Sequence, residues 1–144
     1  MAPAWHLLIV ESPSRAQSGM RYPLLEGAYR VLGRAVSAAD ATVQLTVDGA
    51  RALDPDRMQL VTRATGGQAV RSRLTRRGPD VELQDDGVSR THAMVFVDTR
   101  GAVSVVDLMS TNGTEVNGQH VQDADLDPGD VIRIGGTTLR LERG

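Results

Sequence analysis

Short apolar runs separated by polar turns follow one another along most of the chain. Eight runs have the length and the hydrophobic spacing of strands: residues 6–11, 21–25, 29–32, 81–83, 92–97, 103–107, 131–134 and 137–142. Turn-forming pairs stand between many of them, such as Arg100-Gly101 and Pro128-Gly129. Short strands at nearly regular spacing favour an antiparallel β-sandwich. The pattern therefore predicts an all-β domain.

Residues 42–79 do not follow this pattern, and we interpret them as an insertion. Asp54-Pro55 has the form of a helix N-cap followed by proline at the first helical position. Apolar or small residues then recur near the helical period, at Met58, Val61 and Thr65. We expect a short helix or a flexible segment here.

Length and composition fit one soluble domain over residues 1–144, with 40% hydrophobic and 24% charged residues. No apolar run approaches the roughly 18 residues of a membrane span, and the first ten residues lack the basic start of a signal peptide. We expect a cytoplasmic protein with no membrane partner.

Missing residue types exclude several kinds of chemistry. The chain has no cysteine, which rules out disulfides, cysteine zinc sites and thiol catalysis. All 16 basic residues are arginine, so a Walker A loop and a Schiff-base lysine are absent. There are three histidines and no Gly-x-Ser-x-Gly motif. The interpretation is a protein that is not an enzyme and needs no cofactor.

Charge is unevenly distributed along the chain. Residues 51–77 hold seven arginines and two aspartates, a net charge of +5, whereas residues 80–130 hold eleven acids and two arginines, a net charge of −9. The basic segment suggests nucleic-acid binding, but no aromatic residue between Tyr29 and Phe96 is available to stack on bases. We interpret it as a loop that is solvated or lies on the protein's own acidic surface.

Two polar motifs stand between apolar strands. The first is Ser-Arg-Thr-His at residues 89–92, and the second is Asp-Leu-Met-Ser-Thr-Asn-Gly-Thr at residues 107–114. If these loops meet at one end of a sandwich, they offer hydroxyl, amide and guanidinium donors, which suit a phosphate dianion. Charge-assisted hydrogen bonds of this kind contribute about 1.5–3 kcal/mol each.

The ordered set of motifs resembles the forkhead-associated (FHA) domain family, in its bacterial single-domain form with an insertion after the Gly-Arg motif. Gly33-Arg34 comes first, then residues 89–92, then Ser-Thr-Asn-Gly-Thr at residues 110–114, and then Asn117-Gly118. The resemblance spans nearly the whole chain except residues 35–79. It implies an FHA/SMAD-like sandwich of about eleven strands that recognises phosphothreonine.

The resemblance also implies roles for single residues. Phosphopeptide binding would fall to Arg34, Ser89, Arg90, Thr111 and Asn112, with Arg34 and Ser89 on the phosphate and Asn112 on the peptide backbone. The loops would be shaped by Gly33, His92, Asp107 and Gly113. The expected partner is a threonine-phosphorylated protein in kinase signalling, such as a serine/threonine kinase or its substrate. The alternative function is phosphorylation-independent docking or self-association through the sandwich and its basic insertion.

Simpler interpretations of these residues stay open at this point. Ser89 can be a turn cap, and Asn112-Gly113 can be a type I′ hairpin turn. Because the gap after Gly33-Arg34 is far longer than the family usually has, Arg76 or Arg77 can supply the arginine instead.

Two further positions bear on binding. Gly87 stands where the family often sets its preference for flanking residues, and it has no side chain. The alternating aspartates at positions 123, 125 and 127 lack the glutamate of a calcium loop, and we interpret them as a solvated turn.

Overall fold

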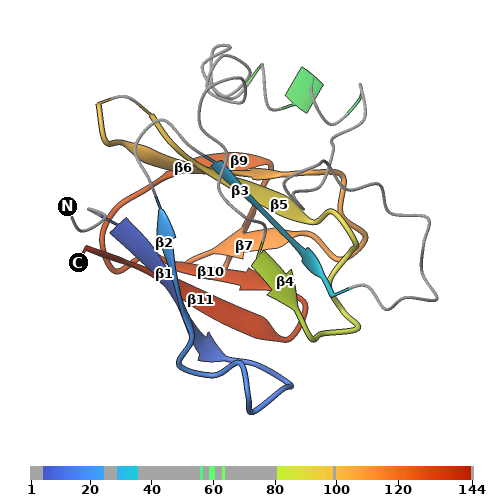
Figure 1. Cartoon of the computed structure of the whole chain (residues 1–144). Coiled ribbons are helices and arrows are strands. Elements are labelled where there is room, and N and C mark those ends of the chain that lie inside the picture. Colours follow the sequence, from blue (N-terminus) through green and yellow to red (C-terminus); the bar gives the residue numbers. More distant parts are fainter. Residues whose placement is uncertain are drawn as a thin grey trace, which may run out of the picture.

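The computed structural model describes residues 5–24, 29–35, 56, 59, 60, 63, 81–98 and 100–143, and these form two packed β-sheets (Figure 1). The strands are β1 (Trp5–Glu11), β2 (Arg21–Leu24), β3 (Tyr29–Arg34), β4 (Val81–Leu83), β5 (Ala93–Val97), β6 (Val103–Asp107), β7 (Thr114–Val116), β8 (Gln119–Val121), β9 (Asp123–Leu126), β10 (Val131–Ile134) and β11 (Thr137–Arg143). The predicted all-β sandwich of about eleven strands is confirmed.

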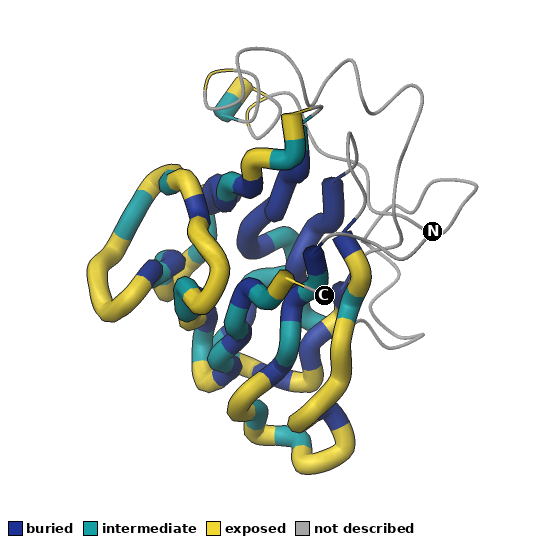
Figure 2. The backbone as a smooth tube through the Cα atoms, turned by 90° about the vertical axis from the view of Figure 1, so that its left-hand side faces the viewer, coloured by how far each residue is buried: buried dark blue, intermediate teal, exposed yellow. Residues whose placement is uncertain are grey.

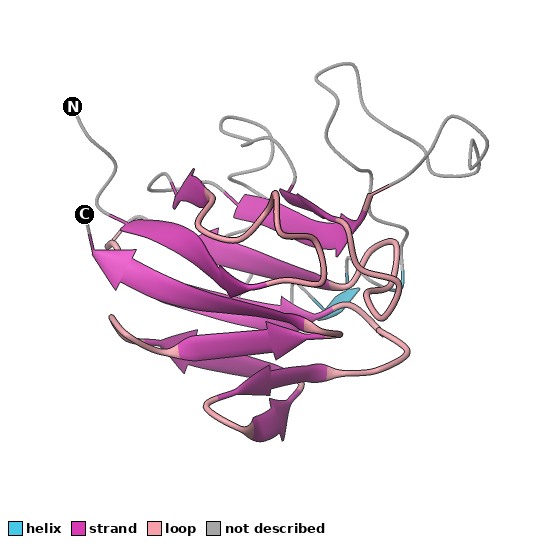
Figure 3. Cartoon of the chain, turned by 90° about the horizontal axis from the view of Figure 1, so that it is seen from below, coloured by secondary structure: helices cyan, strands magenta, loops and turns pink. Residues whose placement is uncertain are grey.

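The two sheets differ in size and lie face to face (Figure 3). One has six strands in the order β2-β1-β11-β10-β7-β8, and the other has five in the order β4-β3-β5-β6-β9. The β3–β4 pair is parallel, whereas the other pairs among the described strands are antiparallel. The parallel pairing of β3 and β4 is possible because a long connection joins them; a tight turn cannot join two parallel strands.

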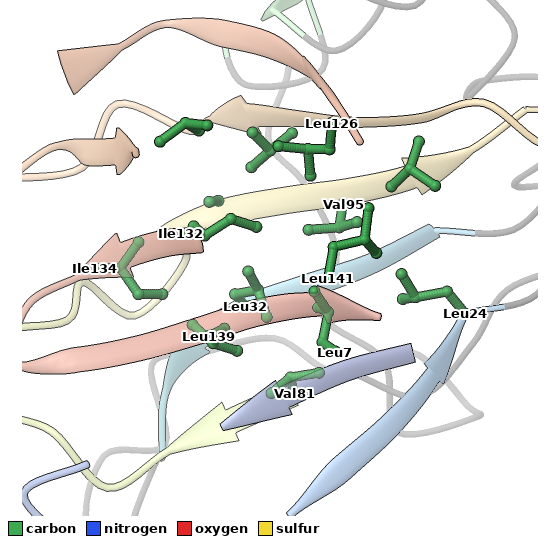
Figure 4. Close-up of a cluster of buried hydrophobic side chains, with 14 of the residues drawn as sticks. Leu7, Leu24, Leu32, Val81, Val95, Leu126, Ile132, Ile134, Leu139 and Leu141 are labelled. Carbon is green, nitrogen blue, oxygen red and sulfur yellow. The ribbon is translucent and has the colours of Figure 1, made fainter. Parts of the chain in front are cut away.

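The main core lies between the sheets. Successive side chains of a strand point to opposite faces, so alternate residues of β1 and β11 enter the core. Leu7, Ile9, Leu139 and Leu141 have no exposed surface. Leu7, Leu139 and Leu141 are labelled in the close-up of this core (Figure 4). Burying side chains of this size stabilises the fold by about 1.5–3 kcal/mol each relative to exposure.

A second apolar cluster covers the outer face of the five-stranded sheet. Its buried members are Tyr29, Val31, Met94, Phe96, Val106 and Leu108, and Leu60 packs against them. Strand β5 is consequently buried at every position. Figure 2 shows such buried residues gathered in the interior of the molecule. Burial on both faces explains why the sequence of β5 does not alternate cleanly.

The expected insertion at residues 42–79 is described at four positions. Asp56, Gln59, Leu60 and Arg63 have helical backbone. Leu60 packs on the outer cluster of the five-stranded sheet. The proposed cap at Asp54-Pro55, the apolar residues Met58 and Val61, and the arginines at positions 71–77 lie outside the described residues.

The interpretation of residues 123–127 as a solvated turn was wrong, because Asp123–Leu126 form strand β9, paired with β6. Asp123 and Asp125 are exposed, while Leu126 is buried in the core. Aspartate is rare in strands, but exposed charges on an edge strand discourage pairing with another chain. Strands β7 and β8 were also missed.

Neither a membrane-crossing helix nor a metal-binding cluster occurs among the described residues. No helix within them is long and apolar enough to cross a membrane. In the same residues, no group of three or more histidine, aspartate or glutamate side chains is arranged to hold a metal ion.

Candidate functional site

The end of β3, the β4–β5 loop (residues 84–92) and the β6–β7 loop (residues 108–113) meet at one end of the sandwich. The Arg34 N–H donates to the Ser89 carbonyl at 3.0 Å. The Thr111 N–H donates to Ser89 Oγ at 3.0 Å, and Asn112 Nδ2 donates to the Gly87 carbonyl at 2.8 Å. The fold therefore gathers motifs that are far apart in the sequence.

Ser89 is fixed by all three of its polar groups. Its carbonyl accepts the Arg34 N–H, and its own N–H donates to His92 Nδ1 at 3.0 Å. Its Oγ accepts the Thr111 N–H. A hydroxyl has one donor hydrogen besides its lone pairs, and none of these bonds uses it. The half-buried Ser89 therefore presents an oriented O–H donor at the surface.

His92 ties the two loops together from inside. It has no exposed surface, its Nδ1 accepts the Ser89 N–H, and its Nε2 bonds the Gly113 carbonyl at 2.7 Å. These partners assign a neutral ring with the proton on Nε2. Burial lowers the pKa of His92, against a smaller opposing effect of the Gly113 bond. Because both ring nitrogens are in use, His92 is a structural group.

Asp107 organises the interior of the β6–β7 loop. Its Oδ1 accepts the Ser110 hydroxyl at 2.5 Å and the Thr114 hydroxyl at 2.7 Å, and its Oδ2 accepts the Ser110 N–H at 3.2 Å. Ser110 Oγ in turn accepts the Gly113 N–H at 2.9 Å. The buried carboxylate is thus satisfied by the loop that it shapes.

Asp85 is an anchor that sequence reasoning missed. The buried carboxylate accepts the Gly87 N–H at 2.9 Å, the Gly136 N–H at 2.8 Å and the Thr137 hydroxyl at 2.7 Å. It thereby joins the β4–β5 loop to the β10–β11 turn. The bond to Gly87 is a local aspartate turn, which the Asp-Asp-Gly sequence signals. The bonds to residues 136 and 137 have no local signal.

Gln17, in the β1–β2 loop, was also missed. Its Nε2 donates to the Glu82 carbonyl at 2.8 Å, and its Oε1 accepts the Gln84 N–H at 2.7 Å. The side-chain amide therefore pairs with the open edge of β4 as a neighbouring strand would. It fixes the point at which the β4–β5 loop begins.

The other residues predicted for binding and loop shaping lie in β3 and in the two site loops. Arg34 lies two residues after the core residue Leu32, so it shares the inner face at the end of β3. Arg90 is half-buried in the β4–β5 loop, and Gly33 is buried within β3. Arg76 and Arg77 lie outside the described residues. Thr111 and Asn112 are exposed beside Ser89.

Asn112-Gly113 is not a type I′ turn. That turn requires positive φ at both residues, and of the pair only Gly113 has it, at 84°. The Asn112 amide, having given one N–H to Gly87, retains an oxygen acceptor and a second N–H donor at the surface. Neutral donors, an acceptor and two arginines at one exposed end suit a peptide that carries an anion.

Comparison with known proteins relates part of the chain to one protein family. Residues 69–135 match the FHA domain family model. The match begins after β3, so it omits Arg34, which the fold nevertheless brings to Ser89.

A curated relative and two solved structures are similar to the chain. FHA domain-containing protein FhaA of Mycobacterium tuberculosis is 47% identical over 66 residues, which cover 44% of this chain and 12% of that protein. The FHA domain of CT664 from Chlamydia trachomatis has a TM-score of 0.62 at 19% identity over 97% of both chains. A structure from work on phosphothreonine-dependent FHA domain interactions has a TM-score of 0.56 at 25% identity, over 97% of this chain and 96% of its own.

Proposed function

We propose that this chain is an FHA domain that binds phosphothreonine-containing segments of partner proteins and performs no reaction on them. The similar structure from work on phosphothreonine-dependent interactions supports this choice of ligand. The site residues support it independently, because they provide binding groups and no activated nucleophile or base.

The geometry of Ser89 carries the proposal. Three hydrogen bonds fix its position, and its hydroxyl hydrogen is left for a ligand. Phosphate oxygens mainly accept hydrogen bonds at neutral pH, so a fixed O–H donor is well matched to them, and an arginine in the same loops can add a charge-assisted bond. In this proposal Arg34 and Ser89 bind the phosphate, Thr111 and Arg90 assist, and Asn112 holds the peptide backbone.

Titration calorimetry with a degenerate phosphothreonine peptide library and its unphosphorylated counterpart tests the proposal. We expect binding only with the phosphate. Ser89→Ala and Arg34→Ala should each weaken it at least tenfold, since a charge-assisted bond contributes about 1.5–3 kcal/mol.

Matched controls stand away from the site. Arg100→Ala is in the turn at the opposite end of β5, and Ser104→Ala is at the second position of β6, near that same end. Both should bind as the unaltered chain does. Equal binding of phosphorylated and unphosphorylated peptides would favour phosphorylation-independent docking instead.

A further inference from the structure

Met109 has an unusual backbone for its residue type. It lies in the β6–β7 loop with φ of 61°, in the left-handed region that disfavours side-chain-bearing residues other than asparagine and aspartate. Both neighbours are held in place: the Leu108 N–H donates to the His92 carbonyl, and the Ser110 N–H donates to Asp107. The loop thus imposes this conformation on residue 109. Glycine or asparagine would adopt it at lower cost.

The side chain of Met109 is also exposed. At 56% exposure it is more open than Val10 and Met20, the other exposed large hydrophobic residues of the described chain, which are each at 42%. Met109 thus combines two unfavourable features, a strained backbone and an exposed apolar side chain. Such strain is characteristic of ligand-contacting positions, and methionine adapts well to varied apolar partners.

The facing loop has no side chain to offer at Gly87. A Cβ added there would lie 3.2 Å from Gly135 Cα and 3.3 Å from Asp85 Oδ1, so the packing leaves little room for one. The Gly87 carbonyl also holds Asn112. Contacts with peptide residues beside the phosphate must therefore come from other positions, and Met109 stands in the same loop as Thr111 and Asn112.

We infer that Met109 is a specificity-determining residue that contacts an apolar side chain flanking the phosphothreonine of the bound peptide. The inference rests on the proposed function. It assigns an apolar preference to a site whose other groups are polar or charged, and it gives the exposed, left-handed methionine a ligand contact.

An oriented phosphothreonine peptide library, screened against the unaltered chain and Met109→Asn, tests the inference. Asparagine tolerates the left-handed backbone, so the variant should fold at least as stably in a thermal melt. The unaltered chain should select an apolar residue at one flanking position, and Met109→Asn should lose that selection. A single peptide with leucine at the position should bind the variant about tenfold more weakly, whereas its alanine counterpart should change less than about twofold.

Two further variants sharpen the result. Met109→Leu should restore the apolar selection, and Met20→Asn, in the β1–β2 loop, should leave it unchanged. If the unaltered chain binds phosphothreonine peptides but Met109→Asn shows the same selection, the inference fails and the proposed function stands. If the unaltered chain does not distinguish phosphorylated from unphosphorylated peptides, the proposed function itself fails.

Discussion

Two Asn-Gly pairs lie on either side of strand β7 and have different structural roles. Asn117-Gly118 joins β7 to β8, with φ of 51° and 85°, as a type I′ turn requires. Asn112-Gly113 joins β6 to β7, and only its glycine has positive φ. The same dipeptide thus builds a hairpin turn in one place and part of the candidate binding site in the other.

Their partners explain the difference. Asn117 bonds to the nearby Asp130 and Val131, which stabilises the β7–β8 turn against β10. Asn112 bonds to Gly87 across the two site loops, and the Gly113 carbonyl accepts a bond from the buried His92. The first pair closes a hairpin and bonds to the start of β10, whereas the second pair bonds across the two site loops. An Asn-Gly dipeptide alone therefore does not distinguish a turn from a site.

The largest difference is expected between the glycines. Gly113→Ala places a Cβ 2.9 Å from His120 Nδ1 at φ of 84°, whereas at Gly118, with φ of 85°, a Cβ meets nothing within 4 Å. Left-handed strain costs about 1–2 kcal/mol at either site, and the contact adds about 1 kcal/mol at Gly113. Urea unfolding should show Gly113→Ala as the less stable variant, and calorimetry should show that only this variant binds phosphopeptide poorly.

The exposed His120 provides an internal control for this experiment. In the double variant Gly113→Ala/His120→Ala the contact is gone, so its stability loss should fall close to that of Gly118→Ala. If Gly113→Ala and Gly118→Ala are equally stable from the outset, the packing of His120 over Gly113 has no energetic effect.

Replacing the two asparagines should affect different properties: peptide affinity at Asn112 and folding stability at Asn117. Asn112→Ala should weaken phosphopeptide binding about tenfold or more, because a peptide group loses a partner worth about 1–3 kcal/mol. Its melting temperature should change little, since Asn112 is exposed. Asn117→Ala should lower the unfolding free energy by about 2 kcal/mol, from two lost side-chain bonds and left-handed strain, with affinity unchanged. The reverse pattern would mean that the roles of the two pairs had been exchanged.

The sequence was informative where local pattern determines structure. The strand runs predicted the all-β sandwich, and the order of the motifs predicted the similarity to FHA domains that residues 69–135 show. Prediction failed at β9, whose aspartates resemble a turn, whereas β5 was predicted to within one residue although it is buried on both faces and does not alternate. The edge position that leaves the aspartates of β9 exposed depends on the order of strands within the sheet, which no local pattern encodes.

The order of the motifs along the chain is distinctive, and the structure brings Ser89 into contact with Arg34 and Thr111. Their binding roles stay a prediction. The anchors Gln17 and Asp85 were not predicted. Gln17 bonds to β4 and Asp85 bonds to the β10–β11 turn across long sequence separations, so their partners become apparent only in three dimensions. Residues that position a site can be common polar residues in ordinary loops.

Lowering the pH should affect the region around Asn112-Gly113, which contacts His92, before the region around Asn117-Gly118. Burial holds the pKa of His92 below 6.5, its unfolded value. Below pH 6.5 the unfolded chain takes up a proton that the folded chain resists, so the contribution of His92 to stability is complete above pH 6.5 and is lost as pH falls toward the lowered pKa. Protonated Nδ1 cannot accept the Ser89 N–H.

Amide hydrogen exchange, corrected for intrinsic rates, measures this effect. Ser89, bonded to His92, should lose protection as the pH is lowered, before Asn117, whose N–H bonds the Val131 carbonyl. Simultaneous loss at both amides would show that acid acts on the whole fold and not through His92.

The smallest effect is expected at Asp130, which supports the second pair. Its Oδ1 accepts Asn117 Nδ2 at 3.0 Å, and its Oδ2 accepts the Asp127 N–H at 2.8 Å. Asp130→Asn keeps one oxygen acceptor and removes a negative charge close to Asp127, so the lost bond and the relieved repulsion partly cancel. We expect a stability change below about 1 kcal/mol and unchanged phosphopeptide affinity. Asp98→Asn is the control at the far end of the sandwich, because Asp98 Oδ1 accepts two backbone N–H groups in the β5–β6 turn and asparagine keeps that oxygen. Small stability losses and unchanged affinity in both variants would confirm that the β7–β8 turn is an ordinary turn. A loss of affinity in Asp130→Asn alone would connect this turn to the binding site and remove the distinction between the two Asn-Gly pairs.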